Sequence, residues 1–189
     1  MNYHSHRIAG FCLGLTSGIL LTNGKTDVSS LCLVALSTAN GTISAVIPDI
    51  DHPNSYIGKK HKVTSFITNK TMGHRGAMHS PFILLILSVL FLVLFNYIPK
   101  DIWNYQNNIL KISNILTILL TSFVAGYFSH LLMDSLTVGG IPWLYPFSKK
   151  CYSIAHLKTN KNEIIAQILF IIPTIIFVLT KYELFKLFI

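Results

Sequence analysis

The chain has 189 residues, of which 51% are hydrophobic and only 12% are charged, and its mean hydropathy is +0.54. This composition excludes a disordered low-complexity protein and argues against an ordinary soluble domain. The 15 Lys and Arg residues exceed the 7 Asp and Glu residues, which gives a formal net charge of +8. In so apolar a chain, we interpret this charge as contact with a membrane surface and expect no binding of nucleic acid.

Five apolar stretches, separated by polar loops, come close to the roughly 17 to 25 residues that a membrane-spanning helix needs. In chain order they are Ile8–Thr22, Ser29–Ile47, Pro81–Ile98, Ile112–Asp134 and Ile164–Thr180. We expect the first to be retained, because the residues after it do not form the small-x-small cleavage site of a signal peptide. The tail Tyr182–Ile189 is expected at the membrane interface. The prediction is an all-α integral membrane helical bundle in which residues 1–189 form a single membrane-embedded domain.

The charges also predict an orientation. If all five stretches cross, the N-terminus and the loops Pro48–Ser80 and Ser135–Glu163 lie on one side. That side holds ten of the Lys and Arg residues and the other holds five, which favours a cytoplasmic N-terminus. All eight histidines fall in these segments or, for His130, about one helical turn from the same end of a span. We therefore expect a multi-pass protein of the cytoplasmic, or inner, membrane with a polar site at its cytoplasmic face.

Small residues indicate which spans pack together. Gly10, Gly14 and Gly18 recur at four-residue spacing in the first span and share one helix face. The second and fourth spans are also rich in Gly, Ala and Ser, whereas the third and fifth consist mainly of Leu, Ile, Val and Phe. Because lipid provides little hydrophobic force between helices, small-residue faces mark close helix contacts. The sequence predicts a core made of the first, second and fourth spans.

The fourth span ends with a candidate half-site for a metal ion. His130 and Asp134 are four residues apart, so their side chains share a helix face with Cβ atoms about 5 to 6 Å apart. A hydrogen-bonded pair at a helix end is the simpler interpretation of such a pair taken alone. Ionisable groups within a span are nevertheless costly and are usually functional.

Two acidic residues follow the second span in the segment Pro48–Pro53. The flanking prolines limit helix continuation and favour a fixed turn, in which Asp49 and Asp51 can approach a common ion. The simpler alternative is an acidic turn that only ends the helix.

Histidines and an arginine precede the third span. Ser80 suits the N-cap and Pro81 the first helical position, which leaves His79 just outside the helix and His74 in the loop before it. Arg75 has the planar guanidinium that suits bidentate binding of phosphate. The alternative role for Arg75 is an anchor to lipid headgroups on the cytoplasmic side.

Together these motifs provide more ligands than one ion needs. His6, expected just before the first span, completes the set, although an interfacial histidine is the simpler interpretation of it. The candidate metal ligands are His6, Asp49, Asp51, His74, His79, His130 and Asp134. Three or four protein ligands and a water make a catalytic zinc site, and these residues suffice for one or two ions. Zn²⁺ is the expected cofactor, with Mn²⁺ or Fe²⁺ as alternatives, whereas His4, His61 and His156 are expected at the solvated surface.

The order of these motifs resembles the YdjM-like family of inner-membrane-associated metal-dependent hydrolases. The resemblance rests on His6, on Pro48–Pro53, on Gly73–Ser80, and on Gly126, Tyr127, His130, Asp134, Thr137 and Gly140. Ser5 and Met78 stand where family members commonly have Thr, but no proposed ligand is missing. More distantly, His-x-x-x-Asp on a helix with an upstream His and Asp is similar to the zinc-dependent phospholipase C and nuclease superfamily, which would make phosphoesters the substrate class.

The resemblance implies a membrane-bound metal-dependent hydrolase, phosphoesterase-like or phospholipase-like, that acts on a phosphoester of a lipid or lipid-like substrate at the cytoplasmic surface. Asp51, Arg75 and His79 are the candidate catalytic residues, with Arg75 expected to clamp the phosphate. Which of Asp49 and Asp51 binds metal, and which orients a ligand or accepts a proton, stays open. A metal-binding transporter and a noncatalytic membrane module with a structural metal site are the alternatives. Membrane lipids are the expected partners, and the oligomeric state is not predicted.

Overall fold

The computed structural model describes residues 1–72, 76–97 and 112–183, and within them every named element is helical. The long helices are α1 (Tyr3–Leu21), α2 (Val28–Ser44), α5 (Pro81–Asn96), α7 (Ile112–Ser135) and α8 (Thr159–Lys181). The shorter elements are the 3₁₀ turns η1 (Pro48–Asp51) and η2 (Ala77–His79) and the helices α3 (Tyr56–Lys60) and α4 (Lys62–Met72). The predicted all-α fold is confirmed for the described residues.

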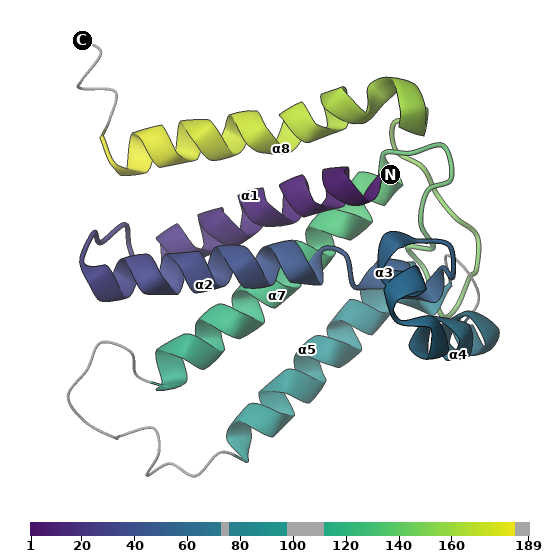
Figure 1. Cartoon of the computed structure of the whole chain (residues 1–189), viewed down its shortest axis with the longest axis horizontal. Helices are drawn as coiled ribbons and strands as arrows, with labels where there is room; N and C mark the ends of the chain where they lie inside the picture. The colour runs from purple at the N-terminus through teal and green to yellow at the C-terminus, as the bar shows by residue number, and fades with distance from the viewer. Residues whose placement is uncertain (73–75, 98–111, 184–189) are drawn as a thin grey trace.

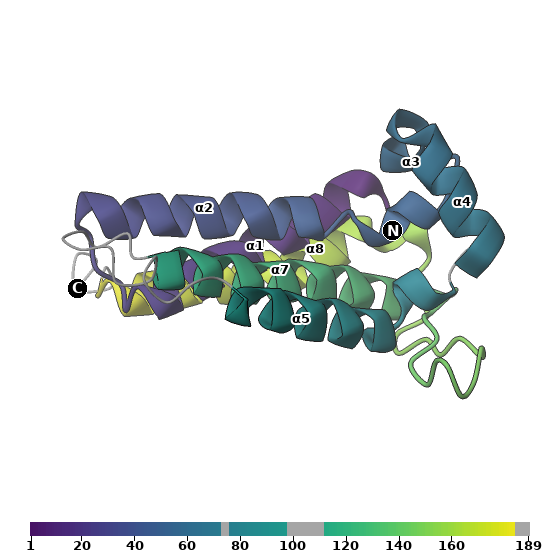
Figure 2. The same ribbon diagram turned by 90° about the horizontal axis from the view of Figure 1, so that it is seen from below.

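The long helices form an elongated bundle with two different ends (Figure 1). The start of α1, the elements α3 and α4, and the irregular segment that joins α7 to α8 lie at one end. The α1–α2 turn and the end of α8 lie at the other end. Seen from below, α3 and α4 project beyond the ends of the long helices (Figure 2). We refer to the end that carries α3 and α4 as the α3–α4 end.

Helices occur at all five places where spans were predicted, but they differ in length and apolar content. Three are long and apolar enough to cross a membrane, namely Val28–Asp51, Ser113–Ser135 and Asn162–Lys181. The helix α5 is apolar but has only 16 residues. The helix α1 has 19 residues, yet its polar first turns and its glycines leave it outside this group. The end of the third predicted span at Ile98 and most of the tail Tyr182–Ile189 lie outside the described residues.

The three helices α1, α2 and α7 make the most extensive contacts in the bundle, as the small residues predicted. At the α1–α2 crossing, a Cβ added to Gly41 would lie 2.7 Å from the Cα of Gly14. Polar side chains reinforce the packing, because Ser37 Oγ donates to the Gly14 carbonyl at 2.7 Å and Asn40 Nδ2 donates to the Leu119 carbonyl at 2.8 Å. The predicted core of these three helices is confirmed, and it brings the start of α1 and the ends of α2 and α7 together.

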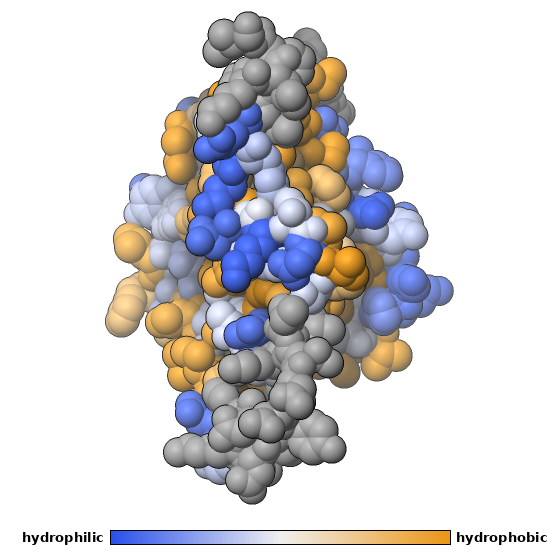
Figure 3. Space-filling view, turned by 90° about the vertical axis from the view of Figure 1, so that its left-hand side faces the viewer, coloured by the Kyte–Doolittle hydropathy of each residue, from blue (hydrophilic) through white to orange (hydrophobic). Residues whose placement is uncertain are grey.

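The other two long helices are largely exposed along their apolar faces. Leu84 is the buried residue of α5, and many Ile and Leu side chains of α8 remain exposed. Figure 3 views the end opposite to α3 and α4, where hydrophilic residues lie near the centre and hydrophobic residues flank them. Apolar sides with a polar end are the distribution expected of a bundle that lies in a bilayer.

Candidate metal centre

The first histidine of the centre lies within a helix rather than before one. The helix α1 begins at Tyr3, so His6 is in its first turn and is fully buried. The helix starts earlier than predicted because α8 supports its polar first turn: Gln167 Nε2 donates to Ser5 Oγ at 2.9 Å, and the Asn2 N–H donates to Glu163 at 3.0 Å. As a result, the His6 ring stacks on the ring of His130, with centroids 3.8 Å apart.

The last turns of α7 contribute two buried side chains, His130 and Asp134. The His130 Nε2 lies 3.6 Å from Asp134 Oδ2, on one helix face as the four-residue spacing predicts. On its other side, His130 Nδ1 donates to the Ala45 carbonyl at 2.7 Å. This hydrogen bond places the proton on Nδ1 and leaves the Nε2 lone pair facing the carboxylates, an arrangement that is typical of metal-binding histidines.

The turn after α2 places its two carboxylates on different sides of His79. Asp49 Oδ1 lies 3.8 Å from His79 Nε2 and 3.9 Å from His130 Nε2. The buried Asp51 instead accepts a hydrogen bond from His79 Nδ1, with Oδ2 at 3.0 Å. Asp49 therefore faces the other candidate ligands, whereas Asp51 holds the His79 ring from behind.

His79 is placed by the structure that caps α5. Ser80 is the N-cap, with its Oγ accepting from the Ile83 N–H, and Pro81 is the first helical residue, as predicted. The Tyr127 hydroxyl of α7 donates to the Met78 carbonyl and so ties the turn η2 to the core. His79 Nε2 then lies 3.6 Å from Asp134 Oδ2.

The carboxylates around His79 determine its protonation. Burial by itself lowers the pKa of the imidazole, but the interactions with Asp49 and Asp51 outweigh burial and raise the pKa to about 9. The carboxylates that favour the proton on His79 would also attract a metal ion, whose binding would displace the proton from Nε2. The electrostatics thus suit a metal ion at the same place.

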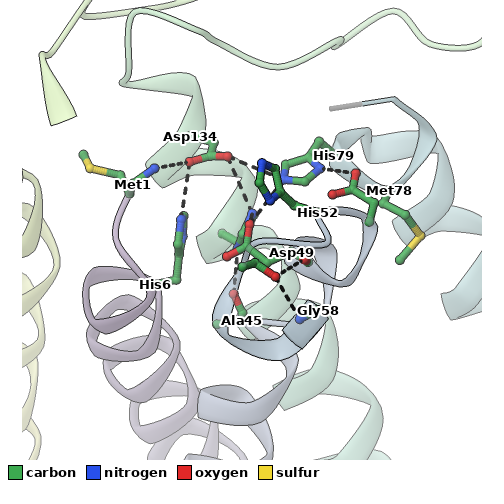
Figure 4. A network of polar contacts seen from close by, with 12 residues as sticks. Met1, His6, Ala45, Asp49, His52, Gly58, Met78, His79 and Asp134 are labelled. Atoms are coloured by element: carbon green, nitrogen blue, oxygen red, sulfur yellow. Dashed lines mark hydrogen bonds and ion pairs between the residues drawn. The ribbon is translucent and has the colours of Figure 1, made fainter. Parts of the chain in front are cut away.

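Five side chains therefore converge at the α3–α4 end from α1, η1, η2 and α7. Four of them, His6, Asp49, His79 and Asp134, are labelled in Figure 4. The facing atoms of the five are Nε2 of His6, His79 and His130 and carboxylate oxygens of Asp49 and Asp134. Two overlapping groups, His6, Asp49 and His130, and His79, His130 and Asp134, each have ligand atoms within 4.8 Å of one another. The amino group of Met1 also lies 2.9 Å from Asp134 Oδ1.

Geometry and unsatisfied polar atoms both fit a metal ion. Five of the separations between these nitrogen and oxygen atoms range from 3.4 to 3.9 Å. Ligands at about 2.1 Å in tetrahedral geometry lie about 3.4 Å apart, so a small contraction brings them to bonding distance. Among the described residues, His6 Nε2 and His130 Nε2 are buried without a hydrogen-bond partner. A metal ion satisfies such nitrogens, and this cluster can therefore hold one.

One side of the cluster opens into a cavity of about 450 Å³. Asp49, His79 and Asp134 line it from the cluster, and Tyr3, His4, His52, Asn54, Ser55 and Tyr56 are among the residues around them. The cavity gives water or a polar ligand a route to the same atoms that would bind the ion.

The remaining predicted site residues lie elsewhere. His74 and Arg75 fall outside the described residues. His61 and His156 are exposed, as expected. His4 is also exposed, but it lines the cavity beside the cluster.

Several supporting groups were not predicted from the sequence. The Ala45 carbonyl belongs to the backbone and has no sequence signal. Asn69 Nδ2 donates to the Asp51 carbonyl at 2.8 Å, and its place in a polar helix did not distinguish it. Tyr127 belongs to the motif around His130, which was the available signal for its supporting role.

Comparison with known proteins is consistent with this picture. The family model described as YdjM inner membrane protein matches residues 1–188. The uncharacterized protein YvsG of Bacillus subtilis (strain 168) is 33% identical over 125 residues, which cover 66% of each chain. The inner membrane protein YdjM of Escherichia coli (strain K12) is 34% identical over 104 residues, which cover 55% of this chain and 46% of that protein.

The chain therefore spans less than two thirds of the length of these curated relatives. No solved structure matches the chain. The family match, in contrast, covers nearly every residue, including all the side chains of the cluster. The chain belongs to the YdjM family of inner membrane proteins.

Proposed function

We propose that this protein is a membrane-bound metal-dependent hydrolase that cleaves a phosphoester of a lipid or lipid-like substrate at the cytoplasmic membrane surface. The observation that supports it best is the convergence of three histidine Nε2 atoms and two carboxylates beside an open polar cavity. A structural metal site has its coordination closed by protein ligands, whereas a catalytic site keeps one side accessible. The cavity provides that accessible side.

The residues divide into ligands and a positioning residue. His6, His79, His130, Asp49 and Asp134 would hold the ion, and mixed imidazole and carboxylate ligands suit Zn²⁺, Mn²⁺ or Fe²⁺. When bound, the ion supplies Lewis acidity, which makes water more acidic and stabilises negative charge on phosphoryl oxygens. Asp51 would orient His79 through the Nδ1 hydrogen bond.

The substrate side of the proposal rests on the cavity and on position. Asn54, Ser55 and Tyr56 line the same cavity as the ligands, and their polar groups would bind a polar headgroup. Arg75 would clamp the phosphate, as proposed from its sequence motif. The site lies at one end of the apolar bundle rather than at its middle, which favours chemistry on a lipid headgroup over transport of an ion.

The test combines metal analysis with an activity assay on the purified protein. We expect bound zinc, manganese or iron, and metal-dependent release of phosphate or a phosphorylated headgroup from a panel of phospholipids and isoprenoid phosphates. We expect His130→Ala and Asp134→Ala to lose both metal and activity. His156→Ala changes an exposed histidine outside the cluster and serves as the matched control.

Two outcomes would contradict the proposal in different ways. If wild-type protein contains no bound metal after gentle purification, the assignment of the cluster as a metal site is contradicted. Full metal occupancy without turnover on any lipid phosphoester would favour a structural site in a noncatalytic membrane module.

A further inference from the structure

A second, larger cavity of about 650 Å³ lies between α1 and α8 and is lined mainly by apolar side chains. On α1 it is lined by residues that include Ile8, Phe11 and Leu15. On α8 it is lined by residues that include Ile171, Ile175 and Leu179. Each set recurs at the three- and four-residue spacing of one helix face, so two apolar faces form the walls of one groove.

The groove has a polar end at the α3–α4 end of the bundle. His4 and Arg7, both exposed, line it there. The Arg7 guanidinium lies over the Tyr3 ring, 5.4 Å from its centroid, and Tyr3 packs against Tyr56 with centroids 4.3 Å apart. These aromatic contacts hold a cation at the point where the apolar groove ends.

The groove and the cavity beside the metal centre meet at His4, which lines both. Tyr3 and Tyr56, which support Arg7, also line the cavity beside the metal centre. The apolar groove, the Arg7 cation and the cavity lined by Asp49, His79 and Asp134 therefore lie next to one another in this order. The apolar groove, the cation and the polar cavity match, in the same order, the hydrocarbon chain, the anionic group and the polar head of a lipid phosphate.

We propose that the groove between α1 and α8 binds one hydrocarbon chain of a membrane lipid phosphate, while Arg7 and His4 hold its phosphate at the entrance to the metal centre. The inference deepens the proposed function by naming the part of the substrate that anchors it. From His4 to Leu15 the groove follows α1 for about 16 Å, given a rise of about 1.5 Å per residue. That length accommodates a single extended chain running alongside α8 within the bilayer.

In the sequence, Arg7 contributes only to the excess of positive charge on the side that holds the N-terminus. In the structure its guanidinium lines the groove and lies over the ring of Tyr3, which in turn lines the cavity beside the metal centre. Guanidinium groups bind phosphate oxygens through paired hydrogen bonds, so Arg7 supplies the polar end of the groove with a group selective for phosphate.

The test uses the full chain in phosphatidylcholine nanodiscs. The probe is an alkyl phosphate with one hydrocarbon chain, which carries a diazirine near the end distant from the phosphate. The comparison probe is the alcohol with the same chain and diazirine but no phosphate. Photolabelled residues are identified by mass spectrometry, and affinity is measured by competition with unlabelled alkyl phosphate. Metal is removed throughout, so that binding is measured without turnover.

Two adjacent residues of α8 provide a matched pair of variants. Ile175 lines the groove and Ile176 does not, yet each is 51% exposed. We expect Ile175→Trp to fill the groove and reduce photolabelling at least fivefold, and Ile176→Trp to leave it unchanged. We expect Arg7→Gln to weaken binding of the phosphate probe about tenfold and to leave the alcohol unaffected, with Arg7→Lys in between.

The inference is overturned if phosphate and alcohol probes label the groove equally, or if Ile175→Trp and Ile176→Trp behave alike. Its failure can be told apart from failure of the proposed hydrolysis. Groove labelling by a probe that metal-loaded protein never hydrolyses would contradict hydrolysis alone. Metal-dependent hydrolysis that both tryptophan variants retain, without groove labelling, would contradict the groove alone.

Discussion

The helices α5 and α7 are neighbours, but the more apolar of the two, α5, is the less buried. The body of α5 consists almost entirely of Leu, Ile, Val and Phe, but Leu84 is its buried residue. The helix α7 carries Ser122, Gly126, His130 and Asp134, and all four are buried. In a soluble protein the more apolar helix would be the more buried one. In lipid the order reverses, because apolar side chains lose nothing by facing acyl chains while small residues allow close helix contacts.

The residues just before α5 differ from the body of that helix. His79 and Ser80 immediately precede the helix and are buried, and both belong to the polar α3–α4 end. The helix α5 therefore contributes to the metal centre through its capping turn, whereas α7 contributes through its own helix face. Five tests probe this division, from the largest expected effect to the smallest.

The close packing of α7 should be the feature most sensitive to mutation. A Cβ at Gly126 would lie 2.8 Å from the carbonyl carbon of Gly41 on α2, and backbone cannot easily yield. We expect Gly126→Leu to lower the free energy of unfolding by about 3 kcal/mol or more. Unfolding in mixed micelles, followed by circular dichroism, measures it. Phe128→Leu changes a more exposed position of the same helix, and an equal loss there would contradict the packing argument.

Loss of a ligand from α7 should have the next largest effect. We expect His130→Ala to weaken metal affinity more than about 100-fold, beyond the range typical of supporting residues. Titration with a competing chelator measures the affinity. His156→Ala is the control at an exposed position. Unchanged affinity in His130→Ala would exclude the assigned centre.

Substitution of the two carboxylates of the turn η1 should weaken metal affinity by different amounts. Asp51 contacts His79 Nδ1 rather than the facing ligand atoms, so we expect Asp51→Asn to weaken metal affinity about 10- to 100-fold while saturation still reaches the wild-type metal content. Asp49→Asn should weaken it further. A larger loss of affinity in Asp51→Asn than in Asp49→Asn would contradict the assignment of Asp49 as the ligand and Asp51 as the positioning residue. Asp27→Asn, at an exposed position near the start of α2, is the control.

A smaller effect is expected where α2 is joined to α7 by hydrogen bonds. Asn40 Nδ2 donates to the Leu119 carbonyl and lies 2.8 Å from Ser122 Oγ as well. Such interhelical bonds contribute about 0.6 kcal/mol on average and up to about 1.7 kcal/mol. We expect Asn40→Ala to lower the free energy of unfolding within this range. The control is Asn96→Ala, because the Asn96 side chain forms its hydrogen bond within α5, and this variant should lower the free energy of unfolding less. Equal losses in the two variants would contradict the interhelical role of Asn40.

The smallest effect is expected on the exposed face of α5. Leu94 is exposed, so acyl chains can replace the contacts that its side chain makes. We expect Leu94→Ala to change the free energy of unfolding by less than about 0.5 kcal/mol. The same micelle assay measures it. A loss above about 2 kcal/mol would show that α5 is covered by protein and would break the comparison with α7.

Much of the fold followed from composition and spacing. Apolar stretches located the long helices, and the small residues of α1, α2 and α7 identified the core, because both properties act along a single helix. The start of α1 was wrong, since His6 was expected before the helix. The contacts of Ser5 and Asn2 with α8, which extend the helix, join residues more than 160 positions apart.

For the site, the sequence by itself determined which residue types gather at one end: the His130 and Asp134 pair, the acidic turn after α2, and His79 before a Ser-Pro helix start. Local spacing is sufficient for such groupings. Only the tertiary structure separated Asp49, which faces the cluster, from Asp51, which holds His79 from behind. It also placed the Ala45 carbonyl against His130 and Arg7 at the polar end of the groove between α1 and α8. These relations depend on distances between different helices, and those distances are determined by close packing across Gly41 and Gly126 rather than by spacing along the chain.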